Sequence, residues 1–121
     1  LGGFKMLIKI NEEEFDFNTK LGAAFKIEER FKKPYIKAIT GVEEMRLKEQ
    51  IDLLSCGLET QEDIKRLKEV LENDGFGNLM DVLEQFIDGL QYPGLTEDEI
   101  VEKKLEKVKR QKKLKALGLI D

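Results

Sequence analysis

Histidine and tryptophan are absent from this sequence, and cysteine occurs once, at Cys56. Without histidine, the chain lacks the most common general base and the most common metal ligand in proteins. A single cysteine excludes an intramolecular disulfide and suits a reducing compartment. No apolar run approaches the roughly 20 residues that a membrane-spanning helix needs. These absences predict a cytoplasmic protein that uses no membrane, metal or cofactor.

Three short features have the composition of chemical motifs, yet each fits a structural role better. Cys56 has no imidazole to activate it, so we expect a small buried residue near a helix end. The run Glu12–Glu14 lacks the partner ligands of a metal site, and we expect a polar hairpin turn there. Gly75 and Gly77 follow no predicted strand and precede no Lys-Ser or Lys-Thr pair, which excludes a phosphate-binding loop. We therefore predict no catalytic, cofactor-binding or metal-binding residues and no enzymatic activity.

Charge is divided unevenly along the chain. Residues 6–99 carry 22 Asp and Glu against 12 Lys and Arg, a net charge of −10. Residues 100–121 carry 8 Lys and Arg against 3 Asp and Glu, a net charge of +5. The acidic body argues against broad nucleic-acid binding, which only the basic end could support. That end fits a solvated helix terminus, a contact to an acidic partner or a second copy, or a contact to phosphates.

Apolar and polar residues alternate in two short segments near the start of the chain. Met6, Ile8 and Ile10 share one side of the first segment, and Phe15 and Phe17 share one side of the second. This alternation predicts a β-hairpin with the two phenylalanines on its buried face. Because a two-stranded hairpin is only marginally stable alone, it must pack on the rest of the protein.

Apolar residues at three- and four-residue steps predict helices in the rest of the chain. The expected ranges are 20–31, 42–56, 61–72, 79–91 and 97–117, and segment 35–40 fits either a short helix or an extended stretch. Thr60, Asn78 and Thr96 are expected to cap the helices that follow them. By their spacing, Leu21, Phe25, Phe31 and Phe86 are assigned to inward-facing stripes.

The predicted fold is therefore mostly α, in the α+β class, and forms one domain. A short N-terminal β-hairpin precedes a compact four- to five-helix bundle with a projecting C-terminal helix. The hairpin and helical body occupy residues 6–95, and the basic C-terminal helix occupies residues 96–121. Residues 1–5 are interpreted as a translated leader or an extension, because their codons can contain AGGAGG shortly before an ATG for Met6.

The opening of the chain resembles the tail assembly chaperones of long-tailed bacteriophages and prophages. Residues 8–17 read IKINEEEFDF and match the I-x-I-N-x-x-x-x-x-F hairpin of that family. Gly22, Phe25 and Glu28 match its G-x-x-F/L-x-x-E helix. The resemblance covers residues 6–31, and the rest of the chain is similar in size, acidity, helicity and charged C-terminal helix.

The resemblance implies a non-enzymatic protein of the bacterial host cytoplasm. It would bind the tape-measure protein, keep its helices soluble and help to recruit tail-tube subunits, and a homo-oligomer is left open. Holding a helical client requires exposed apolar surface rather than catalytic groups. The candidate contact residues are Phe15, Phe17, Ile100, Val101, Leu105, Val108, Lys109 and Lys112. The alternative is a small DNA-associated regulatory protein that uses the basic helix, although no aromatic residues are interleaved there for base stacking.

Overall fold

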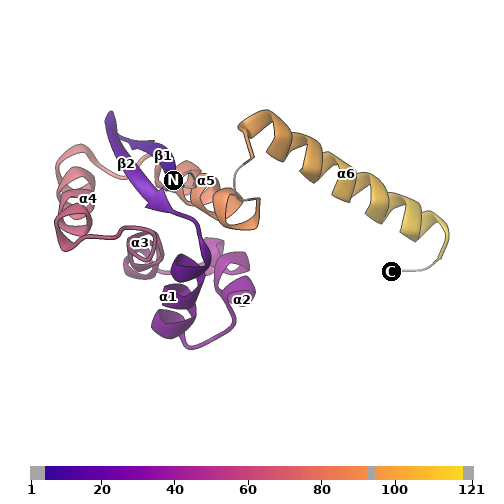
Figure 1. Cartoon of the computed structure of the whole chain (residues 1–121), viewed down its shortest axis with the longest axis horizontal. Coiled ribbons are helices and arrows are strands. Elements are labelled where there is room, and N and C mark those ends of the chain that lie inside the picture. Colours follow the sequence, from indigo (N-terminus) through magenta and orange to yellow (C-terminus); the bar gives the residue numbers. More distant parts are fainter. Residues whose placement is uncertain (1–4, 93–94, 119–121) are drawn as a thin grey trace.

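The computed structural model describes residues 5–92 and 95–118, and it confirms the predicted fold class. Residues 1–4 of the expected leader lie outside the described ranges, while Lys5 belongs to the first strand. The elements are β1 (Lys5–Ile10), β2 (Glu13–Asn18), α1 (Leu21–Phe31), α2 (Tyr35–Thr40), the 3₁₀ helix η1 (Val42–Glu44), α3 (Leu47–Ser55), α4 (Gln61–Asp74), α5 (Leu79–Gln91) and α6 (Glu97–Ala116). Figure 1 shows the hairpin and α1–α5 gathered into one body, from which α6 extends.

The N-terminal hairpin is antiparallel and pairs Ile8 with Phe15, so that alternate side chains point to the same inner face. Its turn consists of Asn11 and Glu12, which have φ values of 49° and 77°. Two positive φ angles give a turn whose twist matches that of the strands, and asparagine tolerates this conformation well. The Asn11 side chain also donates to the Gly75 carbonyl at 2.5 Å, which ties the turn to the end of α4.

The hairpin packs its inner face against α5 and the loop that follows α3. The ring of Phe17 lies 5.3 Å from the ring of Phe86 on α5, measured between centroids. Gly57 approaches both rings closely, and its carbonyl accepts a 2.7 Å hydrogen bond from the Asn18 amide. The residues without exposed surface include Ile10, Phe15, Phe17, Ile27, Ala38, Leu53, Leu54, Leu67, Val82, Leu83 and Phe86. One core therefore joins the hairpin to α1–α5.

Helix α1 faces the core with a different side from the predicted one. Ala23 and Ile27 are buried, whereas Leu21 and Phe25 are 68% and 60% exposed, so their assignment to an inward-facing stripe is wrong. At 3.6 residues per turn, Phe25 lies roughly 200° around the axis from both buried residues. Helix α1 thus has two apolar sides, and it packs on the one that carries the small Ala23.

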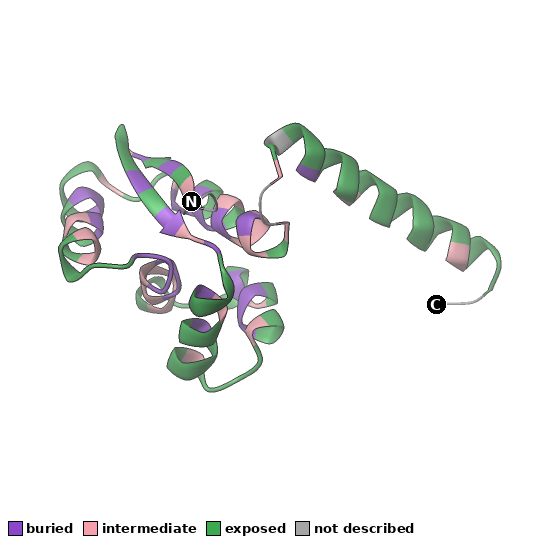
Figure 2. Ribbon diagram, in the orientation of Figure 1, coloured by how far each residue is buried: buried purple, intermediate pink, exposed green. Residues whose placement is uncertain are grey.

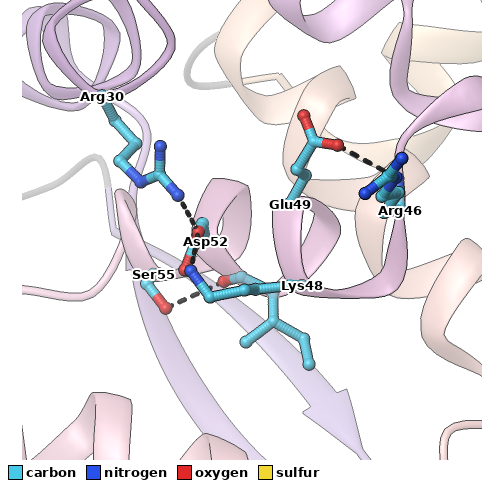
Figure 3. Close-up of polar contacts among 7 residues, drawn as sticks. Arg30, Arg46, Lys48, Glu49, Asp52 and Ser55 are labelled. Atoms are coloured by element: carbon cyan, nitrogen blue, oxygen red, sulfur yellow. Dashed lines mark hydrogen bonds and ion pairs between the residues drawn. The ribbon is translucent and has the colours of Figure 1, made fainter.

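An ion pair joins α1 to α3. The Arg30 guanidinium contacts the Asp52 carboxylate, which also lies 3.6 Å from Lys48 one turn earlier in α3 (Figure 3). Ser55, at the end of α3, donates its hydroxyl to the Ile51 carbonyl at 2.8 Å (Figure 3). Arg30 is thus directed at α3, while Phe25 on the outer side of α1 stays exposed.

The single helix expected over residues 42–56 is wrong, because the chain bends at Met45 and Arg46. Both residues have extended backbones, with ψ values of 148° and 156°, so η1 ends and α3 begins anew. The Glu49 carboxylate accepts from the Arg46 amide at 3.4 Å, and the Gln50 side chain donates to the Val42 carbonyl at 3.0 Å (Figure 3 shows the first contact). These side chains satisfy backbone groups that a continuous helix would have paired internally.

Two of the three expected caps are confirmed. Thr60 accepts from the Asp63 amide at 3.1 Å, and Thr96 accepts from the Glu99 amide at 3.2 Å. Asn78 stands at the N-cap position of α5 but makes no capping bond, so that prediction is wrong. Its φ and ψ of −104° and 16° depart from the extended geometry that lets a side chain reach the first-turn amides.

Candidate partner-binding surface

The inner face of the hairpin is not accessible to a partner. Phe15 and Phe17 have no exposed surface, so the prediction that they contact a partner is wrong. The Arg66 guanidinium lies 4.0 Å above the Phe15 ring and donates to the Glu14 carbonyl at 3.0 Å, while α5 covers Phe17 through Phe86. These two rings of the hairpin are buried against the rest of the body and stabilise the fold. The partner surface must therefore lie elsewhere.

Ile100 anchors α6 to the body instead of contacting a partner. It is 5% exposed, so its inclusion among the contact residues is also wrong. Together with Met6, Val101 and residues of α5, it lines a pocket of about 390 Å³ where α6 leaves the body. The neighbouring Val101 also lines this pocket but keeps 54% of its surface exposed.

Lys104 supplies the polar part of the same anchor. Its ammonium group lies 2.8 Å from one oxygen of Asp88 and 4.0 Å from Glu84, both on α5. The hydrogen bond to Asp88 is the main cause that raises the pKa of Lys104, and the charges of Asp88 and Glu84 act in the same direction. The first turns of α6 are therefore attached to α5 by the buried Ile100 and by Lys104, which pairs with Asp88 and Glu84.

Beyond this anchor, α6 lies in solvent. Residues 105–113 are all exposed, and Figure 2 shows the outer part of the helix almost entirely green. Val101, Leu105 and Val108 are 54%, 53% and 46% exposed and lie on one side of the helix by their spacing of four and three residues. We call this set the α6 stripe. Within the described ranges, it is an apolar helix face that the protein itself does not cover.

The basic residues proposed as contacts are also exposed. Lys109 and Lys112 are both exposed, and Lys112 follows Val108 by four residues, in line with the α6 stripe. Lys109 flanks the stripe one residue after Val108. The structure therefore places five of the eight proposed residues on one accessible stretch of α6: Val101, Leu105, Val108, Lys109 and Lys112.

Sequence reasoning missed a second exposed apolar pair on α1. Leu21 and Phe25 occupy consecutive turns of its outer side, and no atom lies within 4 Å of where a Cβ would sit on the neighbouring Gly22. The signal that could have revealed them is the alternative stripe formed by Ala23 and Ile27. Because both sides of α1 are apolar, periodicity alone does not say which one is covered.

The expected burial of Cys56 near a helix end is confirmed. The thiol is buried at the end of α3, and its pKa is raised from 9.0 to about 11, first by burial and second by the charge of Asp52. At neutral pH it is a protonated thiol, which is neither a good nucleophile nor a ready metal ligand. Cys56 acts here as a small apolar side chain in the core.

Across residues 5–92 and 95–118, no three His, Cys, Asp or Glu side chains are grouped so that they could hold a metal ion. Over the same described ranges, no helix has the length and apolar character required to cross a membrane.

Comparison with known proteins identifies no relative. No protein-family model, curated protein or solved structure matches the chain.

Proposed function

We propose that this protein is a non-enzymatic tail assembly chaperone of a long-tailed bacteriophage or prophage. It acts in the bacterial cytoplasm, binds the tape-measure protein through α6 and helps tail-tube assembly. The observation that carries the proposal is the α6 stripe, an exposed apolar face on a helix that projects from the body. The match of residues 8–17 and of Gly22, Phe25 and Glu28 to that family's opening motifs supports the choice of family.

The magnitude of the expected contact suits a transient role. Fully burying a valine or leucine side chain is worth roughly 1.5–3 kcal/mol, so covering three half-exposed ones gives about 2–4.5 kcal/mol before the cost of association is subtracted. A binding free energy near 4 kcal/mol corresponds to a dissociation constant of about 1 mM. The stripe alone is therefore too weak for a lasting complex, and repeated sites or the adjacent lysines must strengthen it. A chaperone that releases its client during assembly needs a contact of this kind.

The proposal is tested by co-expressing the protein with the tape-measure protein of the same phage or prophage and measuring how much co-purifies. Leu105→Asp places a charge in the centre of the α6 stripe and should reduce the recovered client several-fold. Leu21→Asp is the matched control, since it changes an exposed leucine at the first turn of α1, where an acidic residue suits the helix dipole. Unchanged recovery with folded Leu105→Asp protein contradicts the proposal.

The second candidate is a DNA-associated regulatory protein, favoured by the cationic character of exposed α6. Five of the nine residues from 105 to 113 are lysine or arginine. Phosphate contacts would give an affinity that falls steeply as salt rises. A gel shift of double-stranded DNA at low salt that disappears at high salt supports this candidate, and no shift at low salt rejects it.

A further inference from the structure

We propose that α6 binds an acidic amphipathic helix in one fixed arrangement. The apolar part of the partner lies on the α6 stripe next to the body, and its carboxylates lie on Lys112 and Lys115 near the C-terminal end of α6. The inference rests on the proposed function, because it specifies the chemistry and placement of the client helix at that same surface. It arises from the order of residues along the exposed side of α6.

The exposed side of α6 has the spacing of a coiled-coil seam. Val101, Leu105, Val108, Lys112 and Lys115 follow one another at steps of four, three, four and three residues. This is the alternation of the two core positions of a heptad, which keeps one line of side chains facing a partner helix. The seam extends about 21 Å at 1.5 Å per residue. Its inner three members are apolar, and its outer two are exposed lysines.

The outer half of the seam has no acidic counterpart within the protein. Of the eight Lys and Arg between residues 103 and 115, only Lys104 forms an ion pair within the described part of the chain, with Asp88 and Glu84. Glu106 is the only acidic residue in the same stretch. A partner that covers Lys112 and Lys115 must therefore bring its own negative charge, since burying two unpaired ammonium groups is costly. This charge requirement identifies the partner helix as acidic at that end.

The same seam argues against pairing between the α6 helices of two copies. Parallel pairing would place Lys112 and Lys115 opposite their own copies, and Lys109 beside Lys104 of the other helix. Antiparallel pairing would place those lysines against the apolar stripe. Parallel pairing would bury like charges together, and antiparallel pairing would leave charges against apolar side chains. Both costs disfavour pairing of α6 with its own copy. The occupant of the seam is therefore a helix of a different chain.

The test uses the whole 121-residue chain and fluorescent helical peptides as long as the seam. The ordered peptide has apolar residues opposite Val101, Leu105 and Val108, and glutamates opposite Lys112 and Lys115. The scrambled peptide has the same composition, but a glutamate stands opposite Leu105. Fluorescence anisotropy at low salt should show that the ordered peptide binds at least about tenfold more tightly, since a carboxylate on the apolar stripe loses its hydration.

Charge reversal on the protein then tests the outer half. Lys112→Glu with Lys115→Glu should weaken binding of the ordered peptide about tenfold, as two attractive pairs become repulsive. A peptide with lysines in place of the two glutamates should restore binding to this variant. Lys103→Glu with Arg110→Glu is the control, because it makes the same change in net charge on the opposite side of α6 and should have a much smaller effect.

The outcomes separate this inference from the proposed function. Equal loss in both charge-reversed variants, or equal affinity for the ordered and scrambled peptides, overturns the inference. If the tape-measure protein co-purifies through Leu105 while the lysine pair behaves like its control, the proposed function stands and the inference fails. If seam-specific peptide binding is seen while the tape-measure protein does not co-purify, the inference stands and the client is another protein.

Discussion

Replacing Gly57 by alanine tests how the hairpin packs on α5. A Cβ at this position would lie 2.5 Å from the Cε1 atom of Phe86 and 2.8 Å from the Cδ1 atom of Phe17. Both rings are fully buried, so neither has solvent into which it can rotate. The loop also cannot withdraw freely, because the Gly57 carbonyl accepts the hydrogen bond from the Asn18 amide.

The expected cost follows from this geometry. Inserting a methyl group into a well-packed core costs roughly 1–3 kcal/mol. If the rings separate, the contact between them is weakened as well, and an aromatic pair is worth about 0.5–1.5 kcal/mol beyond its buried area. We expect Gly57→Ala to lower the free energy of unfolding by about 2–4 kcal/mol, out of a typical total of roughly 5–15 kcal/mol. At about 4 °C per kcal/mol, Tm should fall by roughly 8–16 °C.

Gly22→Ala is the matched control, since it makes the same chemical change on the exposed side of α1. No atom lies within 4 Å of the added Cβ, and alanine is favoured over glycine inside a helix by up to about 1 kcal/mol. Urea unfolding followed by far-ultraviolet circular dichroism gives the midpoint and slope for both variants. A wild-type midpoint for Gly57→Ala would refute the packing of Phe17 and Phe86 on this loop, and an equal loss in both variants would refute the geometric explanation.

Three further predictions concern titration, docking and capping. The pKa of Cys56, raised from 9.0 to about 11 by burial and then by Asp52, means that the unfolded thiol ionises first. Stability should therefore fall as pH rises from about 9 to about 11; urea midpoints measured across this window should fall less in Cys56→Ala, and an identical fall would contradict the assignment. Asp88→Asn should lower the pKa of Lys104 and speed amide hydrogen exchange in the first turns of α6 but not in the middle of α5. Unchanged exchange would mean that this ion pair does not hold the helix. Thr60→Ala should lower the free energy of unfolding by about 1 kcal/mol through loss of the cap of α4, and a midpoint within experimental error of wild type would argue against that cap.

Local patterns predicted most of the elements correctly because their causes are local. Alternation over the hairpin and helical periodicity from residue 61 onward depend on neighbouring residues alone. Thr60 and Thr96 precede acidic first turns, and the resulting caps require only the helix that follows. The bend at Met45 was missed because no proline or glycine marks it. It depends on Glu49 and Gln50 bonding to backbone groups of the preceding segment.

The candidate surface was predicted in part. Val101, Leu105 and Val108 were correctly expected to be exposed, because a projecting helix has too little of the protein around it to cover an apolar stripe. Ile100 was wrongly grouped with them, because only the position of α5 shows that the first turn of α6 is covered.

The sequence by itself determined which faces of each element are apolar, where charge changes sign and that histidine chemistry is excluded. Those properties belong to single segments and do not depend on contacts between segments. Only the tertiary structure decided which apolar faces are covered: the Phe17 face lies against α5, whereas the Phe25 side of α1 is left in solvent. Burial depends on a surface that is distant in the chain. When two faces are similarly hydrophobic, only the geometry of the neighbouring elements determines which one is buried.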